Sequence, residues 1–159
     1  MRKVLIPTDF TIESLQLVEY AILNFPDKKL DIILIAGHKL PDTRWALTRF
    51  RTRTQVRKQL NEKFNASIKR ITMEHKKNIE RVSFELFTGI NSYAFQNFLE
   101  QLDAHDAVIP KERTLYCENR KWFDTTKFIK KNVKNIIEAP MECAEEIPQR
   151  KFSILSLFN

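Results

Sequence analysis

Short apolar runs along the chain predict a small set of β-strands. Runs without internal alternation are typical of strands that a parallel sheet buries on both faces. Three such runs lie at residues 4–6, 30–36 and 107–109, and they end at Pro7, Gly37 and Pro110. A fourth run, residues 82–88, alternates apolar and polar side chains, which indicates a strand at or near a sheet edge.

Between these runs, apolar positions recur at intervals of three or four residues, which predicts helices. Helix caps are expected at Asp9 or Thr11, at Asn91 or Ser92, and at Thr125 or Thr126. Strands and helices therefore alternate along the chain. This order predicts an α/β fold, with a single open five-stranded parallel sheet and helices on both of its faces.

Residues 40–78 form a long segment between the second and third predicted strands. Its apolar stripe, at spacings of three or four, consists of Val56, Leu60, Phe64, Ile68, Ile71, His75 and Ile79. At 1.5 Å per residue, one unbroken helix here would exceed about 50 Å, longer than a domain of this size is wide. We therefore expect a break, a bend or a projecting end. Trp45, Leu47 and Phe50 precede the stripe less regularly and are expected in a separate turn or short helix.

The last strand of the sheet has two candidates. Residues 152–158 have strong strand composition and follow an acidic, proline-flanked loop at 139–151. Residues 135–138 are the alternative, which would leave 152–158 as an extra arm. The first candidate is favoured because helical spacing continues from Phe128 to Ile137.

The length of 159 residues suits one domain. We treat 1–159 as that domain, with a basic helical segment at 39–81 and an acidic loop and C-terminal strand or arm at 139–159. No apolar run approaches the roughly 20 residues of a membrane span, and the run near the N-terminus is too short for a signal peptide. Cys117 and Cys143 lie far apart, which favours reduced thiols in a cytoplasmic protein. The three histidines show no ligand spacing, so no metal site is predicted.

The opening of the chain resembles that of a known family. The residues concerned are Val-Leu-Ile-Pro-Thr-Asp-Phe-Thr at 4–11, then Glu13-Ser14-Leu15 and Glu19-Tyr20-Ala21. This strand, loop and helix resembles the start of a universal stress protein domain. The resemblance implies the strand order 3-2-1-4-5. It also implies a last strand on an edge, where it commonly pairs with its counterpart in a second subunit.

The resemblance also indicates where a ligand would bind. In an open α/β sheet, ligands lie beyond the carboxyl ends of the strands, where the strand order reverses. In nucleotide-binding members, the Asp matching Asp9 contacts the base or ribose. A loop of pattern Gly-x₂-Gly-x₉-Gly-Ser/Thr after the fourth strand closes on the phosphates. The candidate cleft residues are Thr8, Asp9, His38, Lys111, Thr114 and Thr125.

The glycine loop is absent from this chain. Its three glycine positions fall on Lys111, Thr114 and Asp124, and only Thr125 keeps the expected hydroxyl. A Cβ at each position obstructs the approach of the backbone to a phosphate. No cofactor is therefore expected, although side-chain cations such as Lys111 leave binding of ATP or AMP as an alternative. Without a ligand, Asp9 serves as a helix cap and His38 as a hydrogen-bonded loop residue.

The net charge of +7 is concentrated in the middle of the chain. Thirteen Lys or Arg and four Asp or Glu lie between Lys39 and Arg81. One stretch without acidic residues contains Arg44, Arg49, Arg51, Arg53, Arg57 and Lys58, with Trp45 and Phe50 among them. This composition is typical of surfaces that bind nucleic acid, and it also suits an acidic protein or anionic lipid. A solvated helix face whose aromatic side chains cover the sheet accounts for it without a partner.

The chain contains no Walker loop, no Gly-x-Ser-x-Gly turn and no paired histidines at helical spacing, so no enzyme is predicted. The main hypothesis is a universal stress protein-like, non-catalytic stress-response or regulatory protein. It would act as a homodimer through residues 152–158 or the edge near them. The first alternative is a nucleotide-binding switch that uses Thr8 and Asp9. The second is a module that binds nucleic acid or an acidic partner through residues 44–58.

Overall fold

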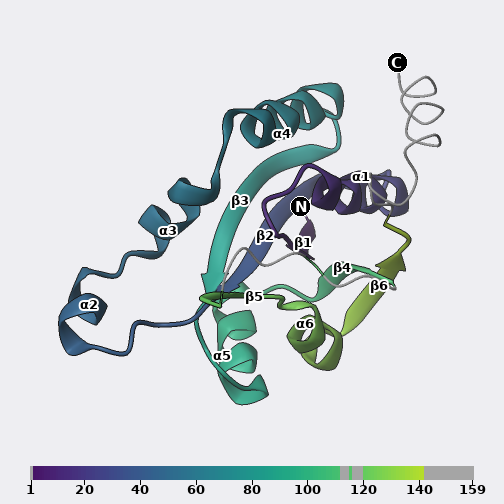
Figure 1. The fold of residues 1–159 in the computed structure, drawn as a ribbon. Helices are drawn as coiled ribbons and strands as arrows, with labels where there is room; N and C mark the ends of the chain where they lie inside the picture. The colour runs from purple at the N-terminus through teal and green to yellow at the C-terminus, as the bar shows by residue number, and fades with distance from the viewer. Residues whose placement is uncertain (1, 112–114, 116–119, 142–159) are drawn as a thin grey trace.

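The structure is a computed structural model that describes residues 2–111, 115 and 120–141. Five parallel strands form an open sheet in the order β3-β2-β1-β4-β6 (Figure 1). They are β1 (Arg2–Pro7), β2 (Leu30–His38), β3 (Ile79–Phe87), β4 (Asp106–Pro110) and β6 (Asn135–Ala139). The predicted α/β class and the implied order 3-2-1-4-5 are confirmed for these five strands. A two-residue strand, β5 (Trp122–Phe123), is an addition that the sequence did not predict, and it pairs antiparallel with the end of β2.

Helices cover both faces of this sheet, as the sequence predicted (Figure 1). The helices in the described residues are α1 (Gln16–Asn24), α2 (Arg44–Arg49), α3 (Thr52–Gln59), α4 (Glu62–Glu74), α5 (Ser92–Leu102) and α6 (Thr126–Asn132), with a 3-10 turn, η1 (Glu13–Leu15), before α1. All of them except α2 pack on the sheet. One core cluster joins α1, α3 and α4 to the sheet. The other cluster joins α5 and α6 to the opposite face.

The buried strands supply both core clusters because neighbouring side chains of a strand point to opposite faces. In β2, Ile32 and Leu34 belong to the cluster that contains Phe64 of α4. Ile33 and Ile35 belong to the cluster that contains Phe95 of α5. Burying a large apolar side chain contributes about 1.5–3 kcal/mol. The apolar run Ile32–Ala36 of β2, a strand with neighbours on both sides in the sheet, therefore stabilises both layers of helices at once.

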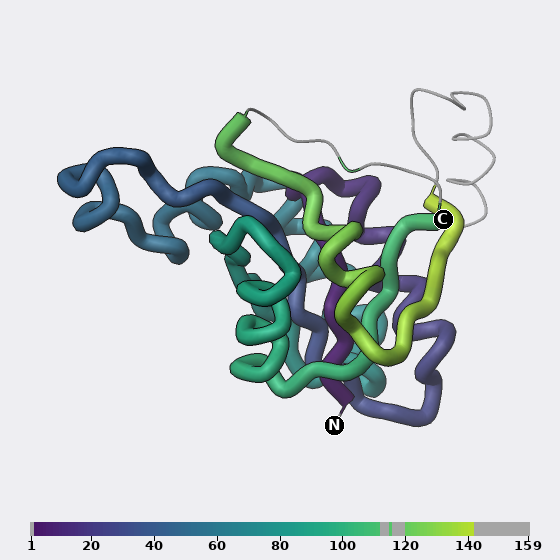
Figure 2. Tube along the Cα trace, turned by 90° about the horizontal axis from the view of Figure 1, so that it is seen from below, coloured from purple at the N-terminus to yellow at the C-terminus, as the bar shows by residue number. Residues whose placement is uncertain are grey.

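The long middle segment is broken, as its length predicted. Thr43 accepts a hydrogen bond from the backbone N–H of Ala46 at the start of α2, and Asn61 accepts one from Phe64 at the start of α4. Phe50 and Leu60 have extended backbone and separate the three helices. Figures 1 and 2 both show α2 at the end of an arm that extends away from the sheet.

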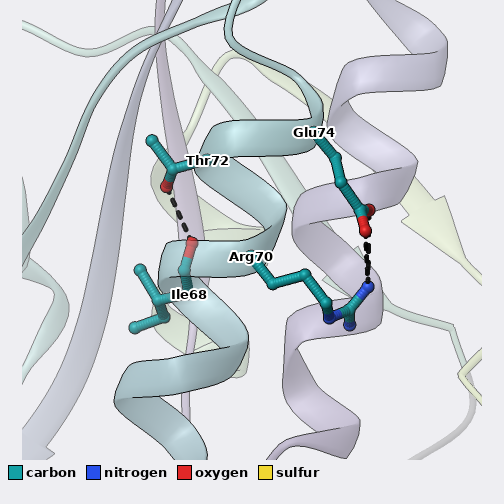
Figure 3. A network of polar contacts seen from close by, with 4 residues as sticks. All are labelled: Ile68, Arg70, Thr72 and Glu74. Atoms are coloured by element: carbon teal, nitrogen blue, oxygen red, sulfur yellow. Dashed lines mark hydrogen bonds and ion pairs between the residues drawn. The ribbon is translucent and has the colours of Figure 1, made fainter.

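The outer helix α4 contains an ion pair and a side-chain hydrogen bond on its surface. Arg70 lies one turn before Glu74, and the two side chains form an ion pair of 3.4 Å (Figure 3). On the same helix, the Thr72 hydroxyl donates to the carbonyl of Ile68 at 2.8 Å (Figure 3). The predicted apolar stripe is confirmed within α4. Ile79, however, is the first residue of β3, so the helical reading extended too far.

The last helix is shorter than its spacing predicted, and the preferred assignment of the final strand is wrong. Helix α6 ends at Asn132, and β6 pairs in parallel with β4. Ile136 packs against the core of α5 and α6, whereas Ile137 packs against the core of α1 and α4. Only a strand sends adjacent side chains to opposite faces in this way. The alternative at 135–138 therefore holds the fifth position, and residues 152–158 lie outside the described part of the chain.

Among the residues described, none of the helices combines the length and the apolar character needed to cross a membrane.

Candidate functional site

A pocket of about 240 Å³ opens beyond the carboxyl ends of β1 and β2. Three segments that are distant in sequence form its walls. The loop after β1 contributes residues 8–11, and the junction of α3 and α4 contributes Gln59 and Asn61. The segment after β4 contributes Leu115 and residues 122–124. The pocket therefore lies at the end of the sheet where open α/β folds bind ligands.

The loop after β1 is held in a strained conformation. Phe10 has a φ of 62°, in the left-handed region that a bulky side chain rarely adopts. The hydroxyl of Thr8, which is buried, accepts a hydrogen bond from the Phe10 N–H at 3.1 Å. The Phe10 ring packs on the rings of Phe64 and Trp122, with centroids 6.1 and 5.4 Å away. Packing on several elements thus fixes this conformation and sets the floor of the pocket.

Asp9 stabilises the same loop from within. Its Oδ1 accepts hydrogen bonds from the backbone N–H and the hydroxyl of Thr11. The Thr11 hydroxyl in turn accepts from the backbone N–H of Ser14 at 3.3 Å. Of the two predicted caps, Thr11 bonds the turn that opens the helix. Asp9 acts on that turn through Thr11.

Asp124 occupies the position of the third glycine in the nucleotide loop. Its Oδ2 accepts a hydrogen bond from the backbone N–H of Leu115 at 3.1 Å. Its Oδ1 accepts from the backbone N–H and the hydroxyl of Thr126 at 2.9 and 2.6 Å. Thr125 occupies the N-cap position of α6, as predicted, but its side chain forms no capping hydrogen bond. The carboxylate one residue earlier accepts the free backbone N–H of Thr126, the first residue of the helix, instead.

Thr125 itself is almost completely buried. Its hydroxyl is the one buried side-chain oxygen or nitrogen atom without a hydrogen-bond partner in the described residues. Thr125 does not line the pocket. The hydroxyl that the family resemblance singled out therefore lies behind Asp124, and not at the ligand-facing surface.

The side chains around the pocket make it acidic and aromatic. Its two charged residues are Asp9 and Asp124, and no lysine or arginine of the described chain lines it. Phe10, Trp122 and Phe123 supply aromatic surface. Within the part of the chain that the structure describes, a polyphosphate would meet the carboxylates of Asp9 and Asp124 here. The walls better suit an uncharged or cationic molecule that presents a flat ring.

The remaining candidate cleft residues do not gather at the pocket. His38 is buried, and its ring packs on Trp122 and Phe50 with centroids 4.6 and 5.3 Å away. Its Nδ1 lies 2.7 Å from the carbonyl of Lys39, and burial lowers the pKa of the imidazole. Lys111 is exposed and its backbone N–H donates to Ala139. Thr114 lies outside the described residues, so the pocket combines Thr8 and Asp9 with residues that the sequence did not indicate.

The aromatic wall of the pocket, which the sequence did not predict, depends on the close approach of β5 to β2. An added Cβ on Gly37 would lie 2.4 Å from the Phe123 ring, so only glycine leaves room for β5. The pairs Gly37–Phe123 and His38–Trp122 fix this strand. A glycine at a strand end and a Trp-Phe dipeptide in a polar segment are the signals that could have indicated it.

The six cations of the basic stretch are all exposed. The Arg49 guanidinium lies 4.2 Å above the Trp45 ring, and Trp45 remains 67% exposed. Arg51 donates to the carbonyls of Thr48 and Phe50 at 3.2 and 3.1 Å. Phe50 differs from Trp45 because it packs inward against His38 and the core. The structure thus separates the two aromatics that the sequence had grouped together.

No family model and no curated protein matches the chain. Solved structures with a similar course of the chain include the hypothetical protein MJ0577, with a TM-score of 0.49, 15% identity, and coverage of 89% of this chain and 97% of the other. A universal stress protein in complex with cAMP gives a TM-score of 0.46, 15% identity, and coverage of 89% and 98%. A protein of the universal stress protein family from Burkholderia pseudomallei gives a TM-score of 0.45 and 9% identity, with coverage of 87% of this chain and 95% of the other. The strand order of this chain, with β1 between β2 and β4, is the order that the resemblance of its opening segment implied.

Proposed function

We propose that the protein is a non-catalytic regulator with a universal stress protein-like fold, which acts in the cytoplasm as a homodimer and does not bind ATP in the family manner. The observation that carries this proposal is the position of Asp124. Its carboxylate accepts the backbone N–H groups of Leu115 and Thr126 at the place of the third loop glycine. An incoming phosphate would have to displace a hydrogen-bonded anion of the chain itself, which costs several charge-assisted hydrogen bonds.

The arrangement of polar groups around the pocket supports a role without catalysis. Thr8, Asp9 and Asp124 each form hydrogen bonds that hold their own loops in place. The nearby imidazole of His38 lies outside the pocket wall and is enclosed by aromatic rings. Nucleophilic or acid–base catalysis needs a titratable pair that faces the substrate. These side chains support the loops that border a binding pocket.

The outer edge of β6 supports the homodimer. β6 is the last strand in the order, and in the described residues its outer edge has no neighbouring strand. Ile136 and Ile137 are only half-buried there. An unpaired edge strand with apolar side chains favours pairing with another chain. We assign the contact to β6, which replaces the segment 152–158 favoured by the sequence alone.

Calorimetry with ATP tests the first part of the proposal. No heat of binding is expected when ATP or AMP is titrated into the protein, and mass spectrometry of the purified protein should find no copurified nucleotide. Saturable ATP binding in the micromolar range would overturn it. Sedimentation velocity at micromolar concentration tests the dimer, and a purely monomeric boundary would contradict that part.

A second candidate function is a nucleotide-dependent switch, and the pocket beside Thr8 and Asp9 is the observation that favours it. Its volume of about 240 Å³ is below the range of roughly 300–1,000 Å³ typical of small-molecule sites. A nucleoside-sized ring system fits these walls better than a triphosphate. Titration of adenosine, AMP and ATP in parallel distinguishes the candidates. Affinity that increases from adenosine to ATP would support the nucleotide-dependent switch. Affinity that decreases in the same order would mean that the acidic walls of the pocket repel the phosphates.

A further inference from the structure

The basic arm, defined as residues 44–58, contains six lysines and arginines and no acidic residue, a net charge of +6 in a chain whose net charge is +7. It projects from the body of the protein. It comprises α2, the extended junction at Phe50 and Arg51, and α3 as far as Lys58. Helix α2 has no buried residue, and α3 has one, Val56. Both views of the chain show the arm extending away from the sheet (Figures 1 and 2). A partner can therefore approach it from several sides.

The arm is firmly attached at its middle. Phe50 and Arg51 have extended backbone, with ψ of 127° and 123°. Alternation along extended backbone turns Phe50 toward His38 and the core, while its neighbours Arg49 and Arg51 remain exposed. Val56 adds a second anchor on α3. The basic side chains are thus presented from a fixed base.

The cations of the arm lack carboxylate partners within the described residues. Some exposed cations outside the arm do form ion pairs, as in Arg70–Glu74, Lys29–Glu80 and Lys130–Glu138. The arm has six cations and no Asp or Glu between its ends. Like charges this close repel one another. An external polyanion would relieve that repulsion along the whole arm.

The kind of cation and the exposed indole indicate which polyanion. Five of the six cations are arginines, whose planar guanidinium groups bind phosphate with two parallel hydrogen bonds. Trp45 is 67% exposed and already carries the Arg49 guanidinium on its ring. Indole rings beside arginines are the stacking surfaces on which single-stranded bases bind. An acidic peptide would use the arginines but would make no use of the exposed indole as a stacking surface.

We propose that the basic arm binds single-stranded nucleic acid, with the arginines on the phosphates and a base stacked on Trp45. A duplex fits less well because its bases are already stacked and cannot reach the indole. The proposal does not depend on the pocket beyond β1, or on whether that pocket holds a nucleotide. Its failure would leave the proposed regulatory function as it stands.

Fluorescence anisotropy with a labelled oligouridine of about 20 nucleotides tests this proposal. The logarithm of the binding constant is expected to fall linearly with the logarithm of the salt concentration. The slope should be about −4 if all six cations contact phosphates. The triple variant R49Q/R51Q/R53Q is expected to raise Kd at least tenfold and to reduce that slope by about 2. The control K69Q/K76Q/K77Q removes the same charge from exposed positions outside the arm. It should change Kd less than threefold.

Stacking is tested through the two tryptophans of the chain, Trp45 and Trp122. In the variant W122F, the remaining indole fluorescence comes from Trp45, and oligouridine should quench it. W45A is expected to raise Kd about tenfold. A hairpin duplex and poly-glutamate are the competitors to compare, and circular dichroism verifies that each variant is folded. The proposal would be overturned if the duplex bound as tightly as oligouridine. It would also be overturned if poly-glutamate bound as tightly as oligouridine and W45A did not change Kd. The absence of oligouridine binding at low salt would overturn it as well.

Discussion

Phe10 and Trp122 pack edge to face with ring centroids 5.4 Å apart, and this contact joins the loop after β1 to the segment after β4. Both residues line the pocket. Phe10 keeps its left-handed backbone, with φ of 62°, although a non-glycine residue there costs about 1–2 kcal/mol. The aromatic contacts of its ring offset that cost. The shape of the pocket therefore depends on a pair of rings from opposite ends of the chain.

Replacing Trp122 by alanine tests this dependence. W122A removes the ring contacts to Phe10 and His38 and is expected to lower the free energy of unfolding by about 3 kcal/mol. W122F keeps an aromatic ring in the same place and should cost less than about 1.5 kcal/mol. Urea denaturation followed by far-UV circular dichroism measures both. Neutral surface substitutions change the free energy of unfolding by up to about 0.5 kcal/mol. A smaller loss than about 0.5 kcal/mol in W122A would therefore show that the rings do not hold the loop.

Gly37 is expected to tolerate no side chain while Phe123 is present. In G37A, the added Cβ meets the Phe123 ring at 2.4 Å, and that ring is itself packed against Phe87 and Phe128. Overpacking of this kind costs about 1–3 kcal/mol. In the background F123A the same glycine substitution should cost much less. A double-mutant cycle measures the coupling, and additive losses would contradict the steric explanation.

The strands of the sheet could be predicted from the sequence because burial on both faces leaves an unmistakable pattern. Ile32 to Ile35 must face two core clusters in turn, so every side chain is apolar. Ile136 and Ile137 were ambiguous, since two adjacent apolar residues fit a helix end as well as a strand. Only the pairing with β4 decides between them. Local spacing does not contain that information.

The pocket was predictable in part, for a similar reason. Thr8 and Asp9 follow the central strand directly, so the topology of the fold places them at the sheet end. Trp122 reaches the pocket only because β5 pairs with the last residues of β2. Gln59 reaches it because the helical segment bends before α4. Both depend on contacts between distant segments, which no local pattern records.

Asp124 is expected to contribute to stability through its hydrogen bonds. D124A leaves the backbone N–H groups of Leu115 and Thr126 without this acceptor, and the expected loss is about 1–3 kcal/mol. D124N keeps one side-chain oxygen as an acceptor and should lose about half as much. The measurement is chemical denaturation, with K127Q as an exposed control in α6, the helix that Asp124 precedes. Equal stability of D124A and the unchanged protein would remove the structural role assigned to this carboxylate.

His38 gives the fold a defined dependence on pH. Burial lowers the pKa of its imidazole from the ordinary value of 6.5, so the unfolded chain binds the proton more tightly than the folded chain. The contribution of His38 to stability is therefore complete above about pH 6.5, and it decreases as the pH falls from there through the lower pKa of the folded state. One proton changes the free energy of unfolding by at most about 1.4 kcal/mol per pH unit.

Urea denaturation between about pH 5 and 8 should show this slope in the unchanged protein and a smaller one in H38Q. If H38Q and the unchanged protein lose stability in parallel on acidification, the titrating group is not His38.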